Sequence, residues 1–116
     1  EDSKFQALTL YYDKNNDGKL QAWEAALVTE LELSGQSIKS LRGIEYFTEL
    51  ESLNCTSNLL TSLDVTNNRK LRALWCKSNR IVSLDVTPLR DLQILNCESN
   101  RLTYRRTRNW STCCAA

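Results

Sequence analysis

The chain has 116 residues, with 15 basic and 14 acidic side chains and a formal net charge of +1. Its 41% hydrophobic and 25% charged content is that of an ordinary globular domain with a small core. The sequence contains no histidine, which removes the commonest general base and metal ligand. No apolar run approaches the length of a membrane span. The chain begins with Glu rather than Met, so we expect a processed or trimmed N-terminus, which is compatible with an exported origin.

Residues 13–24 fill the calcium-loop pattern D-x-[DN]-x-[DN]-G-x5-E without a gap. Calcium takes about six to eight oxygen ligands, and this spacing offers them on alternate residues of a tight loop. The expected Ca²⁺ ligands are the side chains of Asp13, Asn15, Asp17 and Glu24, the backbone carbonyl of Lys19, and Gln21 directly or through a water. The loop resembles an EF-hand. The alternative is a surface turn, because Asn, Asp and Gly are common in turns for local reasons.

Residues 1–27 are predicted to form an EF-hand-like helix-loop-helix cap. Apolar residues flank the loop near helical spacing, and an open repeat array needs a cap on its first coil. The side chains expected to cover that coil are Phe5, Leu8, Tyr12 and Trp23. A calcium sensor usually opens a groove between paired hands. This sequence has one loop and no Met, so we favour a structural role for the calcium site.

A period of 21 residues dominates the rest of the chain. The motif L-x-x-L-x-C-x-x-N-x-L-T-x-L-D-V begins at Leu50, recurs at Leu71 and recurs again at Leu92. A looser copy precedes it, with Gln36 in the place of the asparagine. The predicted repeats are residues 28–49, 50–70, 71–91 and an incomplete 92–103, followed by an irregular tail at 104–116.

This pattern is typical of leucine-rich repeats. The predicted fold class is an α/β solenoid of about four coils with one short parallel sheet, in which alternate strand residues point inward. The repeated asparagines are suited to bond backbone groups at each turn and to stack as a ladder. Cys55, Cys76 and Cys97 occupy one inward slot, where we expect buried free thiols. Cys113 and Cys114 are expected to be exposed in the tail.

The repeat stops in the middle of the last coil. Arg105, Arg106 and Thr107 stand where Leu, Asp and Val are expected. Three explanations stay open, namely an unusual native terminus, a truncation and a shifted reading frame. Each leaves the last coil poorly covered, so the sequence suggests a homodimer through the C-terminal end. The alternative is that Trp110 folds back and covers that end.

The chain resembles the short leucine-rich-repeat proteins of the Bacteroides group and, more loosely, the internalin-like repeats of bacterial surface proteins. The segments that carry the resemblance are residues 15–24, 28–31, 41–47 and the three motif copies. The resemblance implies a secreted or surface-attached bacterial protein that binds a partner through its sheet.

We therefore expect a non-enzymatic module that binds a protein or a glycan on a concave sheet. The residues predicted to face the ligand are Glu30, Glu32, Asn54, Trp75 and Asn96. The alternative is a calcium-responsive regulator or adhesion component. The sequence has no recognisable catalytic set, and the arginines near the C-terminus are interpreted as a solvated cluster rather than a nucleic-acid site.

Overall fold

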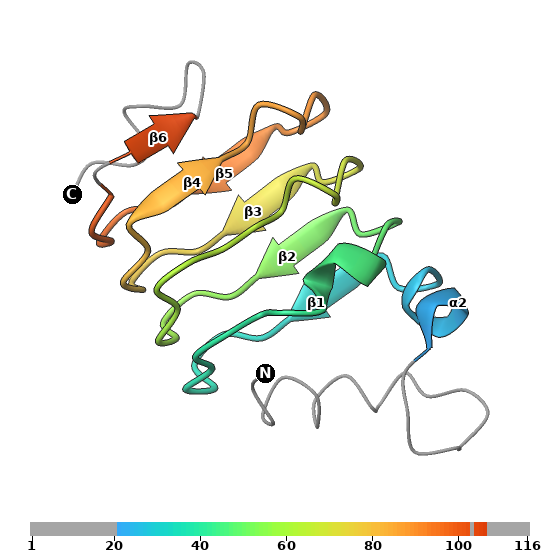
Figure 1. Cartoon of the computed structure of the whole chain (residues 1–116), viewed down its shortest axis with the longest axis horizontal. Coiled ribbons are helices and arrows are strands. Elements are labelled where there is room, and N and C mark those ends of the chain that lie inside the picture. The colour runs from blue at the N-terminus through green and yellow to red at the C-terminus, as the bar shows by residue number, and fades with distance from the viewer. Residues whose placement is uncertain (1–20, 103, 107–116) are drawn as a thin grey trace.

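The computed structural model describes residues 21–102 and 104–106. Their coils stack side by side along the length of the molecule (Figure 1). Each coil contributes one three-residue strand to a parallel sheet, in the order β1 (Glu30–Glu32), β2 (Ser52–Asn54), β3 (Ala73–Trp75) and β5 (Ile94–Asn96). The register aligns residues about one repeat apart. The predicted solenoid and its short parallel sheet are therefore confirmed.

The interior is built from the residues that the repeat places inward. The central strand leucines align across the sheet, and all four are nearly inaccessible to solvent: Leu31, Leu53, Leu74 and Leu95. Leucines, isoleucines and valines from the turns and the back of each coil complete one continuous cluster. Burying one such side chain stabilises the fold by about 1.5–3 kcal/mol, and no coil could bury its own apolar face without a neighbour.

Buried asparagines bind neighbouring coils together, as the sequence predicts. Asn58 donates its side-chain N–H to the carbonyl of Cys55 at 2.9 Å. Asn79 donates to the carbonyls of Cys55 at 2.9 Å and Cys76 at 3.1 Å, and Asn100 donates to that of Cys76 at 2.9 Å. Each side-chain oxygen accepts a backbone N–H from the preceding coil. Successive asparagines thus share carbonyl acceptors in one ladder.

A serine with left-handed backbone geometry precedes each ladder asparagine. Ser57 and Ser78 have φ of 59° and Ser99 has φ of 58°. This conformation is costly for a residue with a Cβ, yet it turns the chain sharply so that the next side chain points into the coil. In the first coil Gln36 is exposed and donates to the carbonyl of Ser34 at 3.3 Å, so it does not act as a rung.

The back of the solenoid is less regular than the sheet. It holds the 3-10 turn η2 (Ile44–Tyr46) and strand β4 (Ser83–Asp85), which pairs in parallel with β6 (Tyr104–Arg106). This two-stranded sheet was not expected from the sequence. Strand β6 also falls within the segment expected to be an irregular tail, so that expectation was wrong for its first three residues.

The expected helix-loop-helix cap falls mostly outside the described residues. Within them, helix α2 (Ala22–Ala25) lies beside the first coil (Figure 1). The backbone N–H of Gln21 donates to Glu24 Oε1 at 2.9 Å, which is half of a capping box and explains why the helix begins there. The prediction that Trp23 covers the core was wrong, because its side chain is 52% exposed.

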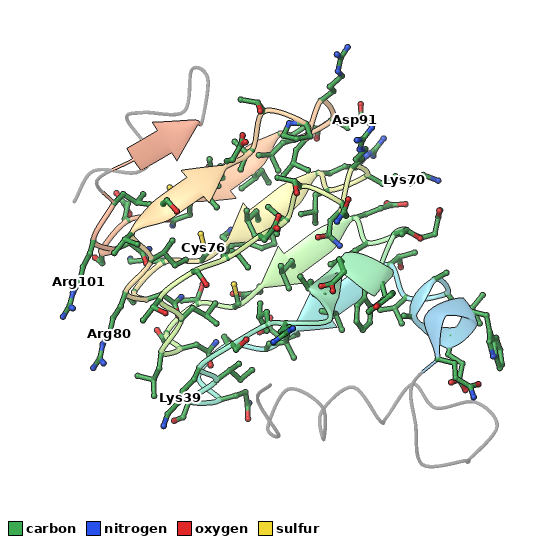
Figure 2. All side chains as sticks on the ribbon, in the orientation of Figure 1. Lys39, Lys70, Cys76, Arg80, Asp91 and Arg101 are labelled. Carbon is green, nitrogen blue, oxygen red and sulfur yellow. The ribbon has the colours of Figure 1, made fainter. Side chains whose placement is uncertain are left out.

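The cysteine slot is buried in every repeat. Cys55 and Cys76 are free thiols with no solvent exposure, and Figure 2 shows Cys76 in the interior between neighbouring coils. Cys97 is also buried but belongs to a disulfide, so the expected free thiol was wrong at that position. Among the described residues, no helix has the length and apolar content needed to cross a membrane.

Candidate functional site

The outer face of the four-stranded sheet presents two rows of side chains. The register places Glu30, Ser52, Ala73 and Ile94 in one row, and Glu32, Asn54, Trp75 and Asn96 in the other. The five predicted ligand-face residues are thus brought onto a single surface, with four of them in the second row. Because the central leucine of each strand points inward, the residues before and after it point outward, as in any strand.

The N-terminal half of this face is acidic and internally hydrogen-bonded. Glu32 accepts the Ser34 hydroxyl at 2.7 Å and the Ser34 N–H at 3.0 Å on Oε1, and the Asn54 amide at 3.0 Å on Oε2. These bonds, those from Ser34 first, hold the pKa of the Glu32 carboxyl below its ordinary value. Glu32 is therefore a fixed negative charge beside Glu30, which is also exposed.

The C-terminal half of the face is apolar and cationic. Trp75 is half-buried, Ala73 beside it is buried, and Ile94 on the next strand is 48% exposed. Arg72 at the entry to β3 and Lys77 just after it are both exposed. Sequence reasoning missed these two cations. They occupy variable positions of the repeat next to β3, and periodicity marks such positions only as surface.

Most of the predicted calcium ligands, from Asp13 to Lys19, lie outside the described residues. Gln21 and Glu24 are described, and they meet in the capping hydrogen bond of α2. The Glu24 side chain has no solvent exposure. Among the described residues, no group of three or more acidic, cysteine or histidine side chains could hold a metal ion.

The back of the solenoid carries a concave feature. A depression of about 410 Å³ is lined by Ser40, Arg42, Glu45, Ser62, Asp64 and Asn67, with three apolar residues beneath. The carboxylates that line it accept hydrogen bonds from nearby residues of their own turns. Glu45 accepts the N–H of Gly43 at 3.0 Å, and Asp64 accepts the Thr66 hydroxyl at 2.6 Å. The bonds from Thr66 keep the pKa of Asp64 below its ordinary value, which fits a structural acceptor rather than a general acid.

These features define a leucine-rich-repeat solenoid with an asparagine ladder, a column of buried cysteines and an exposed sheet face. Two solved structures from Listeria monocytogenes are similar to it. The functional domain of InlJ, which includes a cysteine ladder, matches 72% of this chain at 40% identity with a TM-score of 0.67. The internalin InlF matches 86% of this chain at 27% identity with a TM-score of 0.73.

The chain spans 21% of the InlJ structure and 29% of the InlF structure, so the likeness covers less than a third of each of those longer chains. No protein-family model matches the chain, and no significant match is found among curated proteins.

Proposed function

We propose that this chain is a protein-binding repeat module that uses the outer face of the β1-β2-β3-β5 sheet. The observation that carries the proposal is the half-buried Trp75 beside the exposed Ile94, on a surface formed by rigid strands. Aromatic side chains dominate the energetics of protein interfaces. A rigid strand also loses little conformational entropy when a partner docks on it.

The comparisons support a binding role rather than catalysis, since both similar structures are internalin-type repeat proteins. The same likeness supports a secreted or surface-attached bacterial protein. Four strands make a small face, so we expect weak binding that gains strength when several modules act together. A glycan is the second candidate ligand for the surface around Trp75, because an indole can also stack on a sugar ring.

A photo-crosslinking experiment tests the use of this face. A photoreactive phenylalanine analogue is placed at position 75 on the sheet face or at position 82, where Val82 is 46% exposed outside the sheet. The expected result is crosslinking to a defined protein from position 75, competed by the unlabelled chain but not by its Ile94→Asp variant. Equal labelling from both positions, or competition by the variant, would count against the proposal.

We also propose a structural calcium site at Asp13–Glu24. The supporting observation is Glu24, a carboxylate with no solvent exposure at the position where the loop pattern requires a bidentate ligand. The Gln21 N–H already donates to this carboxylate, and a bound cation would offset more of the cost of removing it from water. The site would contribute its binding free energy to folding.

Thermal melts with calcium, with magnesium and with chelator test this site. At a hundredfold excess over the dissociation constant, binding adds about 2.7 kcal/mol, which raises the melting temperature by roughly 10 °C for a domain of this size. Glu24→Gln should remove the calcium-specific rise, and Glu30→Gln should keep it. A calcium-free chain that stays folded but loses its partner would favour a regulatory site. An equal response to magnesium, or none, would refute both.

A further inference from the structure

The sheet face is electrically divided along the solenoid. Three exposed acids lie on the first two coils, at Glu30, Glu32 and Glu51. Two exposed cations, Arg72 and Lys77, bracket Trp75 on the third coil. Within the described residues these cations form no ion pair, unlike Lys70, whose ammonium lies 2.7 Å from Glu49. The positive charge beside the tryptophan is therefore free to act on a partner.

The apolar part of the face lies within this cationic zone. Ala73 and Trp75 align with Ile94 and Asn96 on the next strand, and the exposed half of Ile94 extends the surface of the indole. Asn96 uses its Oδ1 to accept the N–H of Glu98 at 3.2 Å, which leaves its amide N–H groups as donors. Glu98, one repeat beyond Lys77, marks the outer limit of the zone.

We propose that the partner presents an extended peptide segment in which carboxylates adjoin an apolar side chain on one side, with that acidic end over the third coil. This deepens the protein-binding function proposed above and rests on it. The apolar side chain packs on Trp75 and Ile94, while the carboxylates accept hydrogen bonds from Arg72, Lys77 and the Asn96 amide. Any basic residue of the segment falls toward Glu30 and Glu32.

The dimensions of the face fit such a segment. Four strands at a spacing of about 4.8 Å span roughly 14 Å, and an extended peptide covers that length in about four or five residues. The acids on the first two coils repel a uniformly acidic peptide, and the cations on the third coil repel a basic one. The face therefore selects the direction of the segment as well as its charge.

Nuclear magnetic resonance of the ¹⁵N-labelled chain can test the charge selection. The indole N–H signal of Trp75 is identified by its loss in Trp75→Phe. Three capped pentapeptides share a central phenylalanine and two C-terminal serines, and carry two N-terminal aspartates, two lysines or two serines. We expect the acidic peptide to shift the Trp75 signal with an affinity roughly fivefold tighter than the lysine peptide, the size expected from two exposed charge contacts.

Charge variants provide the matched controls. Arg72→Ala combined with Lys77→Ala should bring the acidic and basic peptides to within about twofold of each other. Arg80→Ala combined with Arg101→Ala removes the same net charge from the edge of the solenoid, where Figure 2 shows both side chains pointing away from the body. That pair should keep the preference.

Three results would overturn the inference. They are equal binding of all three peptides, a Trp75 shift with lactose that exceeds the shift with any peptide, and no shift with millimolar acidic peptide. The first leaves the protein-binding role of the face intact. By contrast, if crosslinking fails but the peptides bind with the expected charge preference, the proposed protein-binding function is contradicted and the charge selectivity of the face is retained.

Discussion

Replacing Asn79 by alanine is the sharpest test of the ladder that joins the coils. The substitution leaves the N–H of Leu60 without its acceptor, Asn79 Oδ1 at 3.1 Å. An orphaned buried donor costs about 1–3 kcal/mol. The carbonyls of Cys55 and Cys76 each lose one of two side-chain donors, which adds roughly 0.5–1 kcal/mol apiece. We expect a loss of about 3 kcal/mol, a large part of the stability of a domain this size.

Urea unfolding followed by far-ultraviolet circular dichroism measures this loss. The matched control is Asn67→Ala, because Asn67 is exposed and its removal should change the free energy of unfolding by less than about 0.5 kcal/mol. A loss below about 1 kcal/mol for Asn79→Ala, with an unchanged dependence on urea, would refute the reasoning.

Three further predictions follow from the repeat geometry. Asn58→Ala combined with Asn79→Ala should destabilise by about 1 kcal/mol more than the sum of the single changes, since the carbonyl of Cys55 then loses both donors. Urea titrations should find the control pair Asn58→Ala with Asn100→Ala additive, and additivity of the Asn58 and Asn79 changes as well would contradict the prediction. Ser78→Gly should be more stable to heat than Ser78→Ala by about 1 kcal/mol, because the φ of 59° strains any residue with a Cβ, and the reverse order would be evidence against strain. Burial raises the pKa of the Cys76 thiol from 9.0 to about 12, so the thiol ionises first in the unfolded state and the stability of the fold should decrease as the pH rises between those values. Alkylation of the folded chain at neutral pH, followed by peptide mapping, should find Cys76 unmodified. Rapid labelling of Cys76 would disprove its burial.

The sheet and its register were predictable because one signal repeats at a fixed period. Leu53, Leu74 and Leu95 recur every 21 residues, and an inward leucine fixes which neighbours point outward. The asparagine rungs were predictable for the same reason, as their side chains have few other ways to be satisfied when buried. The outward position of Trp75 followed directly from this register.

Features without a repeated signal were not predictable. Strands β4 and β6 pair through their backbones, and the sequence of β6 departs from the repeat motif, so no pattern marked the second sheet. Trp23 looked like a core residue from its hydrophobicity. In the short helix α2, however, the buried positions belong to Glu24 and Ala25. The indole of Trp23 is exposed instead and donates to Gln21 Oε1 at 3.0 Å.

The cationic bracket around Trp75 was missed for a different reason. Arg72 and Lys77 vary from repeat to repeat, so periodicity assigns them only to the surface. Their significance comes from the aligned neighbours across the sheet, which only the register of three strands supplies. A site made of residues that vary between repeats gives no periodic signal in the sequence.

The separation of inward and outward rows has a consequence for how such a protein can change over time. The inward leucines and the ladder asparagines do not contribute to the sheet face, and apart from the buried Ala73 the face residues add little to the core. Mutations at exposed or partly exposed positions such as 52, 75 and 94 can therefore explore new partners with little cost to the fold. Because each coil joins the next in the same way, duplicating or deleting a 21-residue unit would lengthen or shorten the recognition surface in whole steps. Stability and recognition are inherited on separate sets of residues, and each can evolve without the other.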